Sequence, residues 1–121
     1  MSNTIIGAIA MFVVGLAFTS TSAMEQSMEE RGMAHFNNPM FAGGQKACND
    51  CHPNGRNLQE AGTKTMFTIM GKKQNSLEEA INMCIIHAIS GEAIPEDSDE
   101  MQEMVSYIKS LGATGVSRYV R

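Results

Sequence analysis

The sequence of 121 residues has no tryptophan, only five phenylalanines and two tyrosines, three prolines and three cysteines. It also has no run of basic residues longer than Lys72 and Lys73, and its formal net charge is −4. Nucleic acid is therefore excluded as the main partner, because nucleic-acid-binding surfaces are basic. A chain of this length has room for one domain. With 43% apolar residues, its composition is that of a folded protein.

Charged side chains are absent from residues 1–24, and residues 5–18 form one uncharged apolar stretch. As a helix, this stretch would cover about 21 Å, which is short of a hydrocarbon core about 30 Å thick. Small residues at positions 21–23 offer a cleavage point, so residues 1–23 are predicted to be a secretory signal peptide. A retained membrane anchor is the alternative, because no Lys or Arg precedes the stretch. Both alternatives place the domain, residues 24–121, outside the cytoplasm, in the periplasm or another exported location.

Two capping boxes mark the starts of helices. Ser27 with Glu30 opens a helix that is predicted to end at residues 37–39, where two asparagines and a proline follow one another. Ser76 with Glu79 opens a second helix, which is predicted to end before a glycine at position 91. One cysteine lies on the apolar face of this second helix. The residues that recur on that face with the helical period are Leu77, Ala80, Ile81, Cys84, Ile85 and Ala88.

A third helix is predicted to begin at Ser98 and to end at Gly112, with acidic residues in its first turn. Residues 113–121 are expected to be a frayed tail. No segment alternates convincingly with the period of two that strands show, so the predicted fold is all-α, with about three main helices. The apolar face of the third helix comprises Met101, Met104, Val105, Ile108 and Leu111.

The segment between the first two predicted helices carries the chemistry. Cys48, Cys51 and His52 form the pattern C-x-x-C-H, which is the attachment sequence of c-type haem. Two thiols one helical turn apart can add to the two vinyl groups of one porphyrin, and the next residue then places an imidazole under the iron. Cys48 and Cys51 are therefore predicted to form the thioethers, and His52 is predicted to be the proximal ligand. The expected cofactor is one covalent haem c.

A bound haem would also compensate for the small number of aromatic side chains in the core. With so few aromatic side chains, a domain of about 100 residues has a marginal core. A covalently held macrocycle supplies apolar surface that the core can bury. Most of the methionines are expected to fill the core and the haem pocket, because a flexible thioether adapts to an irregular surface.

Two other cysteine chemistries fit the pattern less well. A redox C-x-x-C of the thioredoxin type needs a βαβ context, which this sequence does not predict. A zinc site could use Cys48, Cys51, Cys84 and His87 as ligands. Against zinc, Cys84 and His87 fall within an apolar helix, and His52 would have no role in such a site. A zinc-binding domain is therefore the remote alternative.

These motifs resemble those of the monohaem, class I-like c-type cytochromes. The first part of the resemblance covers residues 32–55, which include the haem-attachment sequence. The C-terminal half, through residues 81–84, 90–95, 97–101 and 107–108, is similar to the haem domains of thiosulfate dehydrogenases and of the haem subunit of the thiosulfate-oxidising complex. The resemblance implies a small cytochrome c-like domain folded around one covalent haem.

The resemblance also bears on the sixth ligand of the haem iron. In these relatives the cysteine that matches Cys84 is the distal thiolate ligand, and an arginine four residues earlier takes part in catalysis. The residues alone leave the ligand open among Cys84, Met66, Met70 and His87, because the loop before the third helix contains no methionine. Ligation by Cys84 would also account for an odd cysteine in an oxidising compartment.

The expected function is that of an electron carrier rather than an enzyme. A thiosulfate-oxidising enzyme needs cationic side chains to hold its anionic substrate. The position of the catalytic arginine is occupied here by Ala80, next to Glu78 and Glu79. Enzymes of this type also need a second haem to pass electrons onward, whereas this chain has one C-x-x-C-H sequence. A sulfur-oxidising haem enzyme, or its subunit, is the alternative function.

Redox proteins are the expected partners, and contact with a membrane is expected only if residues 1–23 are retained. His35 is expected to be a surface or packing residue, and Lys72 and Lys73 are expected to be solvated loop residues. An acidic rim around the start of the third helix could dock the basic face of a partner or a membrane complex. The residues of this acidic rim are Glu92, Glu96, Asp97, Asp99 and Glu100.

Overall fold

The computed structural model describes residues 25–117, and their side chains as far as residue 113. The predicted signal segment, residues 1–23, lies outside the described residues, as do residues 118–121 of the predicted tail. Among the described residues, no helix is both long enough and apolar enough to span a membrane.

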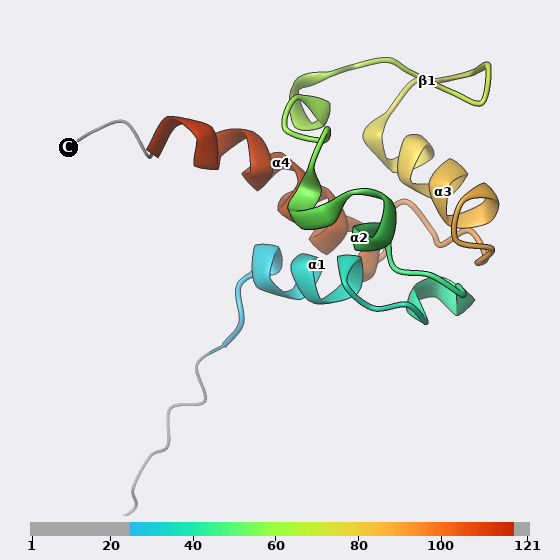
Figure 1. Ribbon diagram of the computed structural model, residues 1–121, viewed down its shortest axis with the longest axis horizontal. Coiled ribbons are helices and arrows are strands. Elements are labelled where there is room, and N and C mark those ends of the chain that lie inside the picture. The colour runs from blue at the N-terminus through green and yellow to red at the C-terminus, as the bar shows by residue number, and fades with distance from the viewer. Residues whose placement is uncertain (1–24, 118–121) are drawn as a thin grey trace, which may run out of the picture.

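Four α-helices and one hairpin form the framework of the described residues (Figure 1). The hairpin pairs β1 (Phe67–Ile69) in antiparallel fashion with β2 (Lys72–Gln74). Helices α1 and α4 pack against each other, and α3 lies beside the hairpin. The helices are α1 (Met28–Phe36), α2 (Cys48–Cys51), α3 (Leu77–His87) and α4 (Asp99–Ser117), and short 3-10 turns occur at Phe41–Gly43, Pro53–Gly55 and Ala61–Thr63.

The all-α prediction is correct for most of the fold and wrong at the hairpin. Each strand has three residues, which are too few to show an alternating pattern in the sequence. Met70 and Gly71 between the strands have positive φ angles of 52° and 76°, as a two-residue type I′ turn requires. Asn-Gly is the usual sequence signal for this turn, so Met-Gly gave no indication of it. Lys72 and Lys73, expected in a loop, lie in β2.

The predicted helix starts are confirmed. At α1, the Ser27 hydroxyl accepts a hydrogen bond from the backbone N–H of Glu30, whose carboxylate accepts one from the N–H of Ser27. At α3, Ser76 accepts from the N–H of Glu79 at 3.0 Å, but the Glu79 carboxylate accepts from the N–H of Asn75 instead of closing the capping box. These side chains satisfy backbone donors that the first turn of a helix leaves without partners.

Two helix ends differ from the prediction. Helix α3 ends at His87, and the chain beyond it places Ile89 rather than Ala88 in the core, with Ile89 3% exposed. Helix α4 continues through Gly112 to Ser117, so the tail is helical over its first residues. A Cβ at Gly112 would lie 2.7 Å from the carbonyl oxygen of Gln59. Gly112 therefore allows α4 to approach the backbone at Gln59 closely, and it does not end the helix.

The core lies where α4 crosses α1 and faces α3. Phe36, Ile85, Met101 and Met104 are each less than 2% exposed. The predicted apolar face of α4 is confirmed, since its residues are buried up to Ile108, and Leu111 packs against the core as a half-buried residue. The short distance between α1 and α4 depends on Gly32, whose Cβ would lie 2.0 Å from the carbonyl oxygen of Glu103.

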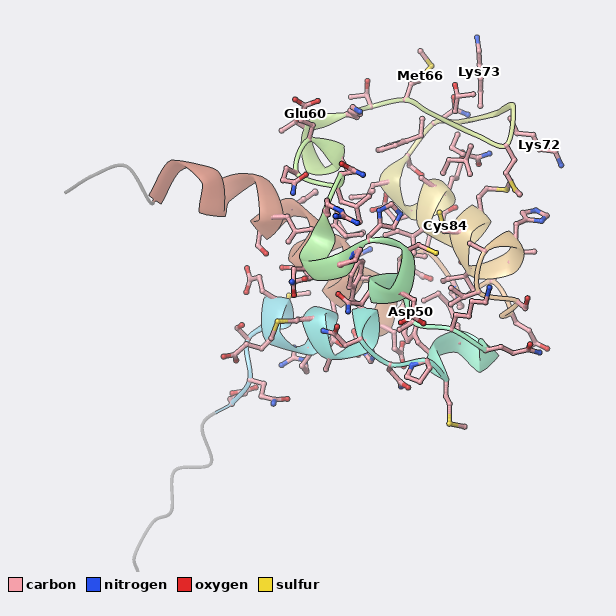
Figure 2. All side chains as sticks on the ribbon, viewed as in Figure 1. Asp50, Glu60, Met66, Lys72, Lys73 and Cys84 are labelled. Atoms are coloured by element: carbon pink, nitrogen blue, oxygen red, sulfur yellow. The ribbon has the colours of Figure 1, made fainter. Side chains whose placement is uncertain are left out.

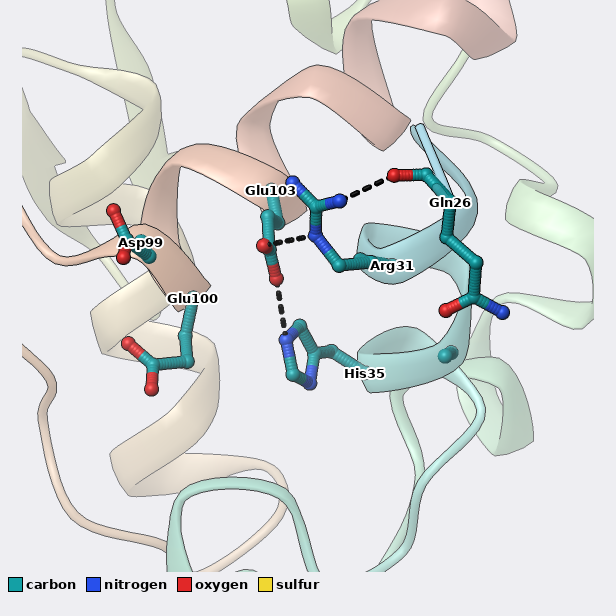
Figure 3. Close-up of a pocket in the computed structure, with 7 residues that line it drawn as sticks. Gln26, Arg31, His35, Asp99, Glu100 and Glu103 are labelled. Carbon is teal, nitrogen blue, oxygen red and sulfur yellow. Dashed lines mark hydrogen bonds and ion pairs between the residues drawn. The ribbon is translucent and has the colours of Figure 1, made fainter. Parts of the chain in front are cut away.

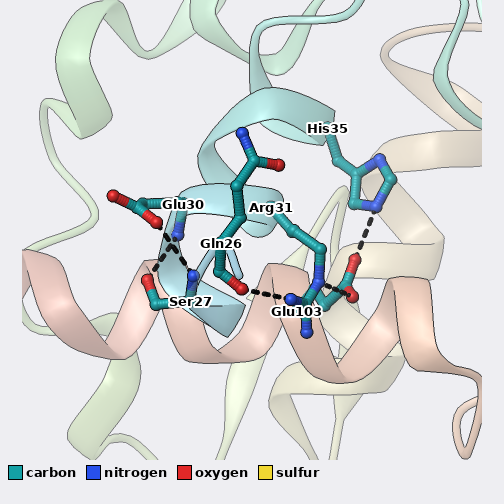
Figure 4. Close-up of polar contacts among 6 residues, drawn as sticks. All are labelled: Gln26, Ser27, Glu30, Arg31, His35 and Glu103. Atoms are coloured by element: carbon teal, nitrogen blue, oxygen red, sulfur yellow. Dashed lines mark hydrogen bonds and ion pairs between the residues drawn. The ribbon is translucent and has the colours of Figure 1, made fainter. Parts of the chain in front are cut away.

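A carboxylate between two basic groups joins the same two helices (Figure 4). The Arg31 guanidinium donates to Glu103, and the other carboxylate oxygen lies 2.8 Å from Nε2 of His35. The hydrogen bond from Arg31 holds the pKa of Glu103 below its ordinary value, and the bond to His35 acts in the same direction. His35 also contacts the ring of Phe41 at 4.8 Å between centroids. His35 was expected to be a surface or packing residue. It packs against Phe41, but it also pairs with the buried carboxylate of Glu103.

Substitution Gly32→Ala should destabilise the fold by about 2 kcal/mol or more, because the added methyl group forces the backbones of α1 and α4 apart. The measurement is the free energy of unfolding by chemical denaturation. The neighbouring exposed substitution Met33→Ala is the control and should change stability by less than about 0.5 kcal/mol. Equal effects of the two substitutions would show that the helix crossing is not tight.

Substitution Met70→Asn should stabilise the fold by about 1 kcal/mol, because asparagine tolerates a positive φ that strains a methionine. For a domain of this size, the unfolding midpoint should rise by about 4 to 8 °C. Met66→Asn, which replaces an exposed methionine without a positive φ, is the control and should give no such rise. A lower midpoint for Met70→Asn would mean that the Met70 side chain makes contacts that outweigh the backbone strain.

Candidate functional site

A cavity of about 110 Å³ lies between α2, β1, α3 and α4. Its walls are apolar, and the lining residues whose side chains carry a nitrogen or sulfur that could bind a metal are Cys48, His52, Cys84 and the core residue Met104. Such a cavity suits an apolar group that is held by a few specific ligands. The other lining residues are Phe36, Leu58, Ala61, Phe67, Ile69, Ala80, Ile81, Met104 and Ile108.

The loop that follows α2 fixes the imidazole of His52. Its Nδ1 lies 3.0 Å from the carbonyl oxygen of Arg56. Because a carbonyl oxygen can only accept, Nδ1 is the donor in this contact, and Nε2 is the ring nitrogen left to face a metal. The loop bends through Asn54, whose φ is 54° and whose N–H donates to the side chain of Asn49 at 2.8 Å. At Gly55 a Cβ would lie 2.4 Å from Leu111, so α4 packs directly against this loop.

Helix α2 carries the two cysteines of the attachment sequence at its two ends. Cys48 is half-buried and lines the cavity, whereas Cys51 is exposed, and neither forms a disulfide. Burial raises the pKa of the Cys48 thiol to about 11, so this thiol is uncharged at neutral pH. The carboxylate of Asp50 accepts a hydrogen bond from the N–H of Ala47 at 3.1 Å, which holds the start of the helix.

Cys84 reaches the same cavity from α3 (Figure 2). Burial raises the pKa of its thiol, and the nearby Cys51 acts in the same direction. Ala80, one helical turn earlier, is 4% exposed and also lines the cavity. The structure therefore brings Cys84 together with Cys48 and His52, and it places no cationic side chain at position 80.

The other three candidates for the sixth ligand lie away from the cavity. Met66 and Met70 are 61% and 71% exposed, and His87 is also exposed. None of the three lines the cavity. The zinc alternative needs His87 beside the three cysteines, and no three His, Cys, Asp or Glu side chains within residues 25–117 form a group that could hold a metal ion. The geometry thus separates Cys84 from the other candidates.

A second cavity, of about 350 Å³, lies at the surface between α1 and the start of α4 (Figure 3). Arg31, His35 and Glu103 line it, and these side chains already bond to one another. Asp99 and Glu100 from the acidic rim lie at its edge. This cavity is separate from the cysteines and the histidine of the attachment sequence. The spacing of Arg31 and His35, which places both on one side of α1, was the signal in the sequence that could have revealed the cluster.

The comparison with known families assigns the domain. Residues 31–115 match the SoxA/TsdA cytochrome c domain family. The chain belongs to this family. No curated protein and no solved structure matches the chain significantly. The matched residues include the attachment sequence, the cavity and the crossing of α1 with α4.

A domain of this family binds haem c covalently, so the chain is a c-type cytochrome domain. The residues of the cavity fit that group, because the walls are apolar and the contact of Nδ1 of His52 with a backbone carbonyl leaves Nε2 to face the iron. Two thiols without a disulfide stand at the ends of α2. The sequence had indicated the thiols and the imidazole, but it could not indicate the Arg56 carbonyl, because every residue has a backbone carbonyl. Leu58, Ala61 and the β1 residues of the cavity wall were also missed.

The wild-type protein, produced with a cytochrome c maturation system, should carry the mass of one haem under denaturing conditions. Cys48→Ala/Cys51→Ala should lose that mass completely, because no thiol of α2 remains to form a thioether. Cys84→Ala is the matched cysteine control and should keep the full haem mass. Loss of the haem mass in Cys84→Ala, or its absence from the wild type, would contradict the assignment of the attachment sites.

Proposed function

We propose that this protein is a monohaem c-type cytochrome that carries single electrons between redox partners outside the cytoplasm. The observation that carries the proposal is the cavity itself. It is apolar, His52 lines it with Nδ1 held by the Arg56 carbonyl, and no lysine or arginine is among the residues that line it. A carrier needs an insulated haem and an exchange surface, whereas an enzyme also needs groups that hold a substrate.

In this proposal Cys48 and Cys51 form the two thioethers and His52 is the proximal ligand. The haem, when bound, supplies a one-electron change at its iron. The chain's own residues hold this group in place and keep water from it. Leu58 and Phe67 belong to the apolar wall that excludes water, and the bond from His52 to the Arg56 carbonyl keeps the imidazole oriented.

We assign Cys84 as the distal ligand. It is the candidate that lines the cavity, while Met66, Met70 and His87 point to solvent. Burial raises the pKa of the Cys84 thiol, so the thiolate is not available without a metal, and a bound iron would favour loss of the proton. Thiolate ligation lowers the charge of the metal site, which favours the oxidised state of the iron.

The alternative is a sulfur-oxidising haem enzyme or one of its subunits. Such an enzyme must hold an anionic substrate close to the iron, and lysine or arginine side chains would do so. Within the described residues, the cavity has none on its lining. Glu78 and Glu79 on the first turn of α3 would repel an anion approaching that end of the helix. These observations favour the carrier.

Location outside the cytoplasm is part of the proposal. Haem attachment to a C-x-x-C-H sequence and an odd cysteine both suit an exported protein, and residues 1–23 have the composition of a secretory signal. Cleavage near residue 23 would release the domain, while retention would hold it at a membrane. Redox proteins of the same compartment would be its partners.

The test of function is turnover. The purified haem protein should exchange electrons rapidly with small one-electron reagents in a stopped-flow experiment, and it should show no thiosulfate-dependent turnover with an artificial acceptor. The Cys84→Ala variant should lose the low-spin thiolate signal in the EPR spectrum, because Cys84 would no longer coordinate the iron. The control Met66→Leu should keep the wild-type spectrum.

Two results would contradict this proposal in different ways. Catalytic oxidation of thiosulfate by the wild type, lost in Cys84→Ala, would establish the enzyme. An unchanged spectrum in Cys84→Ala would leave the carrier intact but remove Cys84 as the ligand, and the same experiment on Met70→Leu and on His87→Ala would then find the residue responsible.

A further inference from the structure

The hairpin has one face toward the cavity and one face toward solvent. Phe67 and Ile69 of β1 line the cavity. In the antiparallel register Phe67 pairs with Gln74, Thr68 with Lys73 and Ile69 with Lys72, and paired residues share a face. Lys72 therefore leaves β2 on the side of Ile69, but next to the turn, where it is exposed. Gln74 is accordingly buried, whereas Thr68 and Lys73 are exposed. The outer face of the hairpin is therefore separated from the cavity by a single layer of side chains.

Large apolar side chains stand on this outer surface. Met66, next to β1, is 61% exposed and Met70, at the turn, is 71% exposed. Figure 2 shows Met66 pointing away from the fold at the hairpin, while Cys84 lies inside it. Single exposed apolar side chains are common on protein surfaces, whereas several on one small element, with polar side chains around them, are typical of a surface that binds another protein.

The conformation of Met70 supports a role for its side chain. Its φ of 52° lies in the left-handed region, where methionine is strained and where asparagine or glycine would be favoured. No contact in the described structure requires a methionine there, since the residue is largely exposed. A residue that is locally unfavourable and exposed is explained when a partner contacts it.

The charge of this surface has the opposite sign to that of the whole protein. The chain carries a net charge of −4, yet residues 61–77 contain Lys64, Lys72 and Lys73 and no carboxylate. All three lysines are exposed, and none takes part in an ion pair found within residues 25–117. Figure 2 shows Lys72 and Lys73 extending from the hairpin in different directions, away from the fold.

We propose that the exposed side chains of the hairpin and its turn, Met66, Met70, Lys72 and Lys73, form the docking surface for a redox partner that presents an acidic face. The lysines would steer an acidic protein to this side of the domain, and the methionines would supply an apolar contact once it has docked. This inference rests on the proposed carrier function. It differs from the sequence-based expectation, in which the acidic rim docks a basic partner, because no residue of the acidic rim lines the cavity.

The reaction at this surface is a transfer of one electron. The reduced cytochrome gives up one electron and becomes oxidised by one unit, and an acceptor of the partner gains that electron. No bond forms or breaks and no proton is needed for balance. Docking at the hairpin matters for the rate because the acceptor then lies beside the wall that Phe67 and Ile69 form.

The first test uses two small oxidants of opposite charge, anionic ferricyanide and cationic tris(phenanthroline)cobalt(III), with the reduced full-length haem protein. Ferricyanide should react faster at low than at high ionic strength, although the protein is acidic overall. The reason is that the positive charge of the hairpin lysines governs the encounter of ferricyanide with the protein. In the double variant Lys72→Glu/Lys73→Glu, oxidation by ferricyanide should be at least about threefold slower at low ionic strength, and oxidation by the cobalt complex should be faster.

The matched controls separate local charge from net charge. Lys73→Glu and Lys109→Glu change the net charge equally, and Lys109 is an exposed lysine on α4. Only Lys73→Glu should slow the oxidation of the protein by ferricyanide. Equal effects of the two substitutions, or faster oxidation of the wild type by ferricyanide as salt is added, would overturn the docking surface. Failure of the wild type to exchange electrons with either reagent, even at high salt, would instead overturn the carrier function.

The second test measures docking itself. Zinc-substituted rubredoxin, a small acidic protein that is redox-inactive in this form, serves as the probe in an NMR titration at low ionic strength. Its dissociation constant should rise at least about fivefold in Lys72→Glu/Lys73→Glu and about threefold in Met70→Asn, but change less than twofold in Lys109→Glu. The shifts should map to the hairpin. No binding, or shifts that map to another face, would overturn the proposal.

Discussion

The close crossing of α1 and α4 at Gly32 is the constraint on which the cavity depends. Because the two backbones approach there, Phe36 from α1 and Met104 from α4 both reach the cavity wall. Glu103 precedes Met104 and faces α1, where Arg31 and His35 bond to it. The ionic cluster thus fixes the rotation of α4 about its own axis. That rotation decides which side chains of α4 face the haem site.

Helix α4 also supports the residue predicted to bind the iron. A helix of four residues such as α2 is not stable by itself, so the position of His52 depends on what packs around the loop that follows. Leu111 lies against Gly55 in that loop, and the loop in turn presents the Arg56 carbonyl to Nδ1 of His52. A disturbance at the helix crossing would therefore reach the imidazole through α4.

The parts of this protein that were predictable are those whose signal is local. The helix starts at Ser27 and Ser76 are signalled by residues three apart, and the C-x-x-C-H sequence is contiguous, so both can be predicted without a fold. The hairpin was not predictable, because its strands are short and its turn uses Met70 in place of asparagine. Gly112 was misinterpreted as a helix end because its partner, the carbonyl of Gln59, is distant in sequence. The separation of Cys84 from Met66, Met70 and His87 likewise required the tertiary structure.

In the proposed docking, the net charge of the protein does not indicate where it meets its partner. The carboxylates of Asp99 and Glu100 lie in the first turn of α4, where they offset the positive end of the helix dipole, and they border the second cavity rather than the haem site. Their position is accounted for by the stability of α4. The lysines of the hairpin have no such local role, yet they stand over a wall of the cavity that the cysteines and His52 share. Under the proposed docking, the charge that matters for electron exchange is the charge next to that wall, and there it is positive.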